Sequence, residues 1–429
     1  MTADALERIS EQPIFRAATQ AAPRLILLEQ ALAAHEAGQL ELAQATYRRI
    51  LDTEPNDGDV LHLYGVVAHQ LGQHAVAVEY IERAIDLNPG IPLYYNNLGS
   101  AYRALKLMDE AFRCLKQSLA LKPDSADALY NLGVVLSDGG DCDEAESCFR
   151  KAIDLRPGLL QAHFNLGILL RRAGRMADAA HSFEQVLRID PDNATARFLS
   201  AAAGGQHADR APTQYVAEVF DTDAEKFDQH LVGVLRYDTP QRLLEMSAGL
   251  LKPDCDNDLL DIGCGTGLVG ASFAPFSRNM VGVDLSQNML VRARARKLYR
   301  RLEHAELLQM MLAEKPASYD IVVAADVFIY LGRLDDIFCA VKQVLRGGGL
   351  FTFSAESLDA LQTGQLLPGD APGYRLHAGG RFAHSAAYVR ALALDYGFRV
   401  NTMLCAPARL ENGKEVLAWL VLLQSETDD

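Results

Sequence analysis

Residues 259–270 read LLDIGCGTGLVG, an apolar segment followed by three alternating glycines and a second apolar segment. Glycine at a strand-to-helix turn lets the backbone touch a ligand, because no Cβ atom intervenes and a positive φ costs little. The stretch therefore predicts a β-strand, a ligand-binding turn and a helix. We expect the rest of the chain either to build this pocket or to bring a partner to it.

The sequence after residue 214 alternates between short apolar segments and amphipathic ones, which predicts a mostly parallel sheet covered by helices on both faces. Near the end of the chain, Glu411-Asn412-Gly413 is a strong hairpin signal between two apolar segments. We expect strands at residues 259–262, 279–285, 305–311, 319–328, 348–354, 399–406 and 414–423, and helices at residues 240–250, 268–274, 287–302, 334–345 and 385–396.

Two interpretations of the glycine turn compete. Residues 265–270 match G-x-G-x-x-G, the dinucleotide-binding pattern. Asp261 lies two residues before Gly263 and gives the pattern D-x-G-x-G-x-G. A carboxylate at that position suits a ligand with an ammonium group and would repel a pyrophosphate. Asp284, at the end of the next predicted strand, suits the ribose hydroxyl groups of either ligand.

The D-x-G-x-G-x-G pattern and the terminal hairpin together resemble class I S-adenosylmethionine-dependent methyltransferases. The resemblance implies a Rossmann-like domain with a mostly parallel seven-stranded sheet that ends in an antiparallel hairpin. It implies S-adenosyl-L-methionine as the cofactor, an adenine contact at Glu306, and aromatic side chains that close over the cofactor. The cofactor-binding residues implied in this way are Asp261, Gly263, Cys264, Gly265, Gly267, Asp284, Leu285, Met289, Glu306, Leu307, Phe220 and Phe227.

The resemblance also places Asp326 and Tyr330 beside the transferred methyl group. Methyl transfer is an in-line displacement, so positioning supplies much of the rate and a dedicated base is optional. Where the acceptor must lose a proton, His384 is the first candidate for the base and Asp326 the second. The alternative for His384, and for His230, is a structural or surface histidine. Arg381 is a candidate for binding an acidic substrate group or, alternatively, a solvated arginine.

Prolines recur every 34 residues in the N-terminal half, at positions 55, 89, 123, 157 and 191. This is the period of the tetratricopeptide repeat, a pair of antiparallel helices, and the pattern resembles that family. Small residues recur where the paired helices cross, and large apolar residues recur at the complementary positions. The small residues are Ala31, Gly65, Gly99, Gly133 and Gly167 in the first helix and Ala43, Ala77, Ala111, Ala145 and Ala179 in the second, and the large ones include Tyr47, Ile81, Leu115, Phe149 and Phe183.

Asn97, Asn131 and Asn165 occupy the same repeat position, each within Asn-Leu-Gly. Side-chain amides can bind a peptide backbone without reading its sequence. The arrangement resembles the asparagine ladder of the O-linked N-acetylglucosamine transferase repeats, which implies a groove for an extended peptide, lined also by Tyr130 and Phe164. The alternative is that the asparagines are solvated and that the aromatic residues pack between repeats.

A chain of 429 residues exceeds what one core usually covers. We expect an N-terminal segment at residues 1–23, a solenoid of about five repeats with a capping helix at residues 24–203, a linker at residues 204–214, and the methyltransferase domain at residues 215–429. The order of these parts resembles bacterial tetratricopeptide-repeat methyltransferases, a family without an assured substrate.

The composition excludes several other classes of function. A net charge of −15 argues against nucleic acid as the main partner. The seven cysteines include no C-x-x-C pair, so no zinc site or disulfide framework is predicted. The sequence shows neither a secretory signal nor a run of apolar residues long enough to span a bilayer, and we expect a cytoplasmic protein.

Three hypotheses about function remain open at this point. In the first, the enzyme methylates a protein or peptide held by the repeats. In the second, the acceptor is a small molecule and the repeats serve assembly or the docking of a carrier protein. In the third, the chain is an adaptor whose methyltransferase fold has lost its activity. The acceptor atom and the oligomeric state are not predicted.

Overall fold

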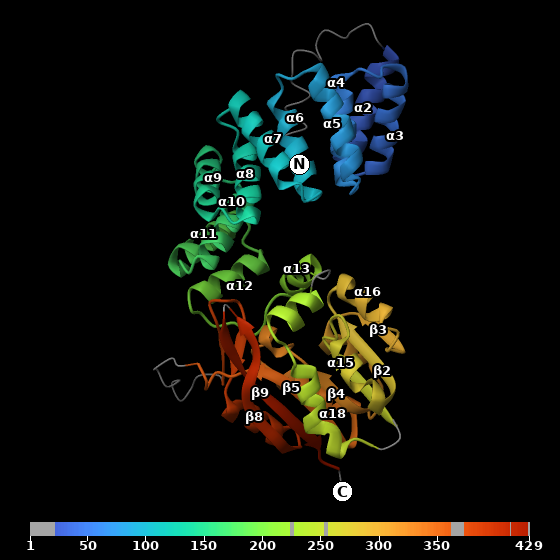
Figure 1. Cartoon of the computed structure of the whole chain (residues 1–429), viewed down its shortest axis with the longest axis vertical. Helices are drawn as coiled ribbons and strands as arrows, with labels where there is room; N and C mark the ends of the chain where they lie inside the picture. The colour runs from blue at the N-terminus through green and yellow to red at the C-terminus, as the bar shows by residue number, and fades with distance from the viewer. Residues whose placement is uncertain (1–21, 224–226, 253–255, 362–372, 412, 428–429) are drawn as a thin grey trace. The chain divides into compact units, whose positions relative to one another are not determined.

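The computed structural model describes residues 22–223, 227–252, 256–361, 373–411 and 413–427. The chain forms two compact units, Met1–Ala173 and Gly174–Asp429 (Figure 1). The described helices of the first unit are α2 (Ala22–Glu36), α3 (Leu40–Thr53), α4 (Gly58–Gln70), α5 (His74–Leu87), α6 (Pro92–Ala104), α7 (Met108–Leu121), α8 (Ala126–Gly139), α9 (Cys142–Leu155) and α10 (Leu160–Arg172).

Close helix crossings hold the first unit together, at the small residues that the repeat pattern predicts. A Cβ atom added to Gly65 would lie 2.6 Å from Ile81 Cγ1, and one added to Gly99 would lie 2.7 Å from Leu115 Cγ. A real Cβ does not approach another atom so closely, so only glycine lets the large residue of the partner helix fit. The predicted pairing of small and large residues is confirmed at these crossings.

The turn between the two helices of a repeat needs a left-handed backbone. Gly38, Gly72, Gly140 and Gly174 have φ between +71° and +89°. The equivalent position of the third repeat is Lys106, whose φ is +61°. The fold therefore imposes the same turn on a side chain that rarely adopts it, which the spacing of the glycines alone did not predict.

The second unit begins with two further helices, α11 (Met176–Ile189) and α12 (Ala194–Ala203). The Phe198 ring of α12 lies 5.4 Å from the Tyr215 ring and 6.1 Å from the Phe382 ring. These contacts attach α12 to the α/β part of the chain. The division between the units thus falls after Ala173, whereas the sequence predicts a boundary near residue 203.

A seven-stranded sheet forms the centre of the second unit, in the order β3-β2-β1-β4-β5-β9-β8. The first five strands in this order are parallel, and β9 runs antiparallel to both β5 and β8. The predicted sheet and its terminal hairpin are confirmed. The strands are β1 (Asn257–Ile262), β2 (Ser277–Asp284), β3 (Arg301–His304), β4 (Tyr319–Ala324), β5 (Leu345–Glu356), β8 (Phe398–Glu411) and β9 (Lys414–Ser425).

Helices pack on both faces of this sheet, so successive residues of a strand enter different cores. Leu260 packs in one cluster with Val322 and Phe338, while Leu259 packs in the other with Leu243. The α-helices are α13 (Thr213–Asp223), α14 (Thr239–Ser247), α15 (Leu268–Phe273), α16 (Gln287–Ala295), α17 (Leu307–Ala313), α18 (Asp335–Val344) and α19 (Ala386–Asp395).

The prediction of a strand at residues 305–311 is wrong, because β3 ends at His304 and α17 covers most of that segment. The predicted helix at residues 287–302 is also too long. The Glu306 side chain caps α17 by accepting a hydrogen bond of 2.9 Å from the Gln309 backbone N–H. A short apolar segment has no clear hydrophobic periodicity, so its pattern does not separate a strand from a helix. Here the cap provided by Glu306 favours the helix.

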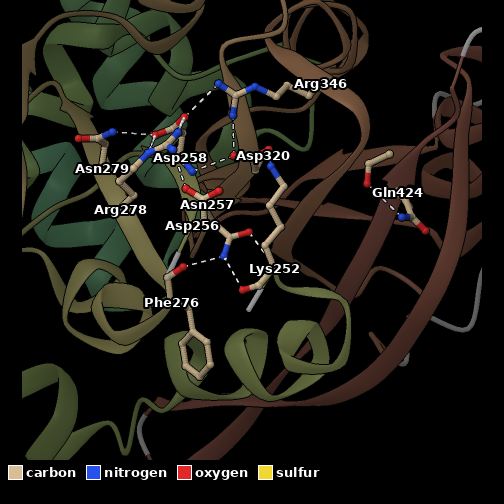
Figure 2. Close-up of polar contacts among 11 residues, drawn as sticks. Lys252, Asp256, Asn257, Asp258, Phe276, Arg278, Asn279, Asp320, Arg346 and Gln424 are labelled. Atoms are coloured by element: carbon tan, nitrogen blue, oxygen red, sulfur yellow. Dashed lines mark hydrogen bonds and ion pairs between the residues drawn. The ribbon is translucent and has the colours of Figure 1, made fainter. Parts of the chain in front are cut away.

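A network of charged residues joins the amino ends of four strands (Figure 2). Arg346 of β5 contacts Asp258 of β1 at 2.9 Å and Asp320 of β4 at 2.5 Å. Arg278 of β2 contacts Asp258 at 2.6 Å. Burial alone would raise the pKa of Asp258, but hydrogen bonds from Arg278, Asn279 and Arg346 outweigh burial and lower it to about 2. The network stabilises the strand ends opposite the glycine turn.

Candidate active site

The glycine turn lies between β1 and α15 and follows the backbone of β2. The N–H groups of Gly263 and Cys264 both donate to the Val283 carbonyl oxygen, at 2.8 and 3.0 Å. Gly263 has a φ of +75°, and a Cβ atom there would lie 2.4 Å from Val327 Cγ2. Gly265 and Gly267 also have positive φ, at +51° and +90°. The turn thus requires glycine both for its conformation and for its close packing.

Asp284 ends β2 and faces this turn. Its Oδ2 accepts a hydrogen bond of 2.8 Å from the Gly265 N–H, and its Oδ1 accepts one of 2.8 Å from the Ser286 N–H. Burial raises the pKa of Asp284, and these backbone donors offset part of that rise. The carboxyl group is therefore held in one orientation at the carboxyl edge of the sheet, where parallel α/β folds bind their ligands.

A cavity of about 250 Å³ opens beside the turn. Most of the predicted cofactor residues and two of the three predicted catalytic residues line it. They are Gly263, Cys264, Gly265, Asp284, Leu285, Met289, Glu306, Leu307, Phe220, Phe227, Asp326 and Tyr330. Gly267, Asp261 and His384 are not among the lining residues. The structure thus brings together residues from segments more than 100 positions apart.

Two Phe-Asp pairs cover the cavity. The rings of Phe220 and Phe227 lie 5.9 Å apart in an edge-to-face arrangement, and both line the cavity. The aspartate that follows each ring binds a loop of the site. Asp221 accepts hydrogen bonds from the Ser286 hydroxyl and the Asn288 N–H. Asp228 in turn accepts hydrogen bonds from the Thr266 hydroxyl and from Arg296. Each pair therefore supplies one ring to the cavity and one carboxylate that binds a neighbouring segment.

Asp261 does not take the position that the sequence predicts. It is fully buried, and its Oδ2 accepts a hydrogen bond of 2.6 Å from the Tyr299 hydroxyl. The residue shares a strand face with Leu259, which packs against α14 and α15. The side chain points into the core and not into the cavity, and the expected contact with a ligand ammonium group stays a prediction.

His384 is likewise fully buried, and its Nε2 lies 3.0 Å from the Gly332 carbonyl oxygen. Burial lowers the pKa of His384 to about 4. A general base must reach the acceptor proton, directly or through one water molecule. This position does not suit a base, and it corresponds to the structural alternative for this histidine. The side chain of His230 lies outside the described residues.

Asp326 follows β4, lines the same cavity as Asp284, and has a left-handed backbone with φ of +56°. Its N–H donates to Ser354 Oγ at 2.8 Å, and the Ser354 hydroxyl donates back to Oδ1 at 3.0 Å. Arg409 Nη1 donates to Oδ2 at 3.0 Å. Three separate hydrogen bonds therefore fix both the backbone and the carboxylate of Asp326.

Arg409 and Glu411, both on β8, line the cavity but were not predicted from the sequence. Arg409 also binds Glu356 and Glu411, and Arg381 binds Glu411 through both terminal nitrogens. Burial would raise the pKa of Glu411, but the two arginines outweigh burial and lower it. No motif marks these residues, because their partners Asp326, Glu356 and Arg381 belong to other segments that only the fold brings to β8.

The repeat asparagines make contacts between neighbouring repeats. Asn131 Nδ2 donates to Asn96 Oδ1 at 2.9 Å, and Asn165 Nδ2 donates to the Tyr130 hydroxyl at 3.1 Å. Asn97 Nδ2 lies 2.9 Å from Nε2 of the buried His62. Phe164 is half-buried. Each amide thus uses one N–H group within the solenoid, which agrees with a structural role and leaves peptide binding as a prediction.

The described residues contain no group of three or more histidine, cysteine, aspartate or glutamate side chains arranged to hold a metal ion. Across the same described ranges, every helix is too short or too polar to cross a membrane.

Comparison with known families supports the division of the chain into repeats and an α/β part. Residues 260–351 match the model of a methyltransferase domain. Residues 91–157 match one tetratricopeptide-repeat model, and two pairs of overlapping segments, within residues 28–113 and 136–204, match a second. The matched methyltransferase segment includes the glycine turn, Asp284 and Asp326.

Curated relatives match about a quarter to a third of the chain. Ubiquinone biosynthesis O-methyltransferase of Pseudoalteromonas translucida is 27% identical over 34% of this chain and 61% of its own length. Malonyl-[acyl-carrier protein] O-methyltransferase of Serratia marcescens is 29% identical over 36% of this chain and 57% of its own length. Human methyltransferase-like protein 27 is 36% identical over 24% of this chain and 43% of its own length. The chain spans between 43% and 61% of the length of these relatives.

Solved structures resemble the repeats. The crystal structure of MamA is 26% identical, covering 38% of this chain and 96% of its own, with a TM-score of 0.34. A thermophilic tetratricopeptide protein of Thermus thermophilus is 22% identical, covering 42% of this chain and 98% of its own, with a TM-score of 0.38. The family models themselves match tetratricopeptide repeats within residues 28–204 and a methyltransferase domain at residues 260–351.

Proposed function

We propose that this protein transfers a methyl group from S-adenosylmethionine to an acceptor that its repeats recruit, and that this acceptor is a protein or peptide. The observation that carries the proposal is the pairing of Asp284 with the Gly265 and Ser286 N–H groups at the edge of the cavity. A carboxylate held in this way keeps lone pairs for two ribose hydroxyl groups. The family model and the curated relatives support the same chemistry.

The residues of the cavity fit this cofactor. The glycine turn leaves room for a ligand against the backbone, while Leu285, Met289 and Leu307 form apolar walls suited to an adenine ring. Glu306 lines the same cavity, and one of its oxygens already caps α17. Asp261 is buried and does not line the cavity, so we assign the amino-acid part of the cofactor to other groups.

S-adenosylmethionine supplies an activated methyl group on a positively charged sulfur. The protein supplies the surroundings. Phe220, Phe227 and Tyr330 form an aromatic group at the cavity, with ring centroids of Phe220 and Tyr330 5.6 Å apart. Aromatic faces favour a cation and exclude water. Asp326 and Tyr330 lie on the loop after β4, where we place the acceptor, so that positioning supplies much of the rate.

The repeats favour a protein or peptide acceptor, because tetratricopeptide solenoids are interaction scaffolds. The alternative is a small-molecule acceptor, with the repeats serving assembly or carrier-protein docking. Two of the relatives, a ubiquinone biosynthesis O-methyltransferase and a malonyl-[acyl-carrier protein] O-methyltransferase, favour that alternative by their names.

Calorimetric titration of the full chain with S-adenosylmethionine tests the first step. We expect saturable binding, and a loss of affinity of about tenfold or more in Asp284→Ala, since hydrogen bonds to a charged group contribute about 1.5–3 kcal/mol each. Asp395→Ala is the matched control, because Asp395 is an exposed aspartate at the end of α19. A folded wild-type protein that gives no binding heat would refute the proposal and favour the inactive adaptor.

A further inference from the structure

The acceptor end of the cavity is built around one buried arginine. The Arg409 side chain is only 4% exposed, and each of its three guanidinium nitrogens contacts a different carboxylate. Nη1 binds Asp326 at 3.0 Å, Nη2 binds Glu356, and Nε binds Glu411 at 3.2 Å. Three of its five N–H groups are thus engaged by carboxylates of the protein. Arg409 therefore holds the acidic groups around it in place.

The second arginine of this group is also occupied. Arg381 Nη2 donates to Glu411 Oε2 at 2.6 Å, and its Nη1 donates to the other oxygen of the same carboxylate. The five side chains thus comprise three carboxylates and two guanidinium groups, with a formal charge of −1. An acidic acceptor placed here would meet carboxylate oxygens and committed cations, which is unfavourable at low dielectric.

Asp326 is the member of this group that is most strongly constrained. Its left-handed backbone is uncommon for any residue except glycine and persists where neighbouring groups over-determine it, as they do at functional sites. Here Ser354 fixes the backbone N–H and Oδ1, and Arg409 fixes Oδ2. An ionised carboxylate is only an acceptor of hydrogen bonds, and two such bonds leave lone pairs free to accept a third.

From this geometry we propose that the acceptor is a nucleophile with its own proton, an amine or a hydroxyl group, and not a carboxylate, and that Arg409 is the positioning residue that holds Asp326 toward that proton. The inference rests on the proposed methyl transfer. In the step, the bond from the acceptor N or O to the methyl carbon forms while the bond from carbon to sulfur breaks. The sulfur keeps the electron pair, and the proton of the acceptor passes to Asp326 and then to water.

One residue of the cavity, Arg210, favours an acidic acceptor instead. Arg210 also lines the cavity, is exposed, and forms no ion pair among those found in the described residues. Arg210 is therefore the cavity arginine most open to an acidic acceptor. The two outcomes differ in the chemistry of the methylated product, because a carboxyl methyl ester is cleaved by mild alkali, whereas a methylated amine or an ether is not.

The first experiment incubates the full chain with S-adenosylmethionine labelled in the methyl group and an extract of the cells that produce the protein. We expect label that survives mild alkali. Release of the label as methanol would overturn the inference while leaving methyl transfer intact. If a wild-type protein that binds S-adenosylmethionine transfers no label, the proposed function fails, and the inference fails with it.

The second experiment measures transfer by variants. Asp326→Asn should lower kcat by about 100-fold or more while the affinity for S-adenosylmethionine stays within about twofold. Added formate should restore part of the turnover of Asp326→Ala, which a purely structural carboxylate would not allow. Arg409→Lys keeps the positive charge but loses the planar guanidinium group, so we expect a kcat between those of the wild type and Asp326→Asn. Glu415→Gln, an exposed carboxylate on the same hairpin, is the control.

Thermal unfolding of each variant separates a folding defect from a catalytic one. A folded Asp326→Asn protein that retains kcat within about threefold would overturn the inference. The inference would also be overturned if Arg210→Gln lost methyl transfer while Asp326→Asn kept it. That result would assign an acidic acceptor instead.

Discussion

The hydroxyl group of Tyr299 donates a hydrogen bond of 2.6 Å to Oδ2 of Asp261, inside the core beneath the glycine turn. The same hydroxyl accepts a hydrogen bond of 3.1 Å from the Gly270 N–H. Asp261 Oδ1 is buried without a hydrogen-bond partner among the described residues. The acidic residue that marks the motif in the sequence is thus a structural element that connects β1 to the segment after α16.

This burial predicts a pH dependence of stability. Burial raises the pKa of Asp261 to about 7, with the hydrogen bond from Tyr299 lowering it in part and the charge of Asp284 raising it. A carboxyl group with a raised folded-state pKa stabilises the fold fully below its unfolded value, near pH 4, and that contribution is lost as the pH rises to about 7. The difference in unfolding free energy between wild type and Asp261→Asn, measured in urea, should therefore change by a few kcal/mol, about 1.4 per pKa unit, between pH 5 and 8. Parallel stability curves over this range would contradict it.

Gly263 of the glycine turn should not tolerate a larger residue. We expect Gly263→Ala to lose S-adenosylmethionine binding and about 1–3 kcal/mol of stability, because a Cβ atom would collide with Val327 and the φ of +75° is strained for alanine. Gly139→Ala is the control, since no atom lies within 4 Å of the added Cβ and its φ is not positive. Calorimetry and urea unfolding measure both variants, and equal behaviour would refute the close-packing argument.

The second Phe-Asp pair predicts a role for Asp228 in holding the cover of the cavity. Asp228→Ala removes the contacts to Thr266 and Arg296 and should weaken S-adenosylmethionine binding about tenfold, since hydrogen bonds to charged groups contribute about 1.5–3 kcal/mol. The melting temperature should change little, because Asp228 is partly exposed. Asp238→Ala provides the comparison, as this exposed aspartate makes no side-chain capping bond to α14. Similar affinities for both variants would show that Asp228 does not hold the site.

We expect the repeat asparagines to affect the binding of the acceptor and not that of the cofactor. The double variant Asn131→Ala, Asn165→Ala should lower transfer to the native acceptor while the affinity for S-adenosylmethionine is unchanged. Because each amide also binds a neighbouring repeat, we expect a stability loss of about 1–3 kcal/mol, and the assay must be run well below the melting temperature. Unchanged turnover would favour a small-molecule acceptor.

The network of Figure 2 predicts sensitivity to acid. The pKa of Asp258 is lowered to about 2, so its contribution to stability is present above about pH 4 and is lost as the pH falls through about 2. Arg346→Gln removes two ion pairs of this network. We expect a loss of about 1 kcal/mol at pH 7, after allowing for solvent screening, and a smaller loss near pH 2. Unfolding in urea at several pH values measures it, and a loss independent of pH would contradict the electrostatic origin.

Local patterns in the sequence were sufficient for most of the fold. The 34-residue period predicted the helix pairs, and the small residues predicted where they cross, because close packing at Gly65 and Gly99 excludes larger side chains. Alternating elements and the hairpin signal predicted the sheet. The short segment after His304 was predicted wrongly, because the Glu306 cap outweighed an apolar run without a period.

The sequence by itself therefore determined the repeats, the parallel sheet with its terminal hairpin, and the turn beside Asp284, since each depends on neighbours along the chain. Tertiary structure alone decided which side chains reach the cavity. Strand register turned Asp261 into the core and buried His384, while β8 brought Arg409 to Asp326 across 83 positions of sequence. Such contacts depend on which strands pair, in what register and under which helices, and no single segment of the sequence encodes that arrangement.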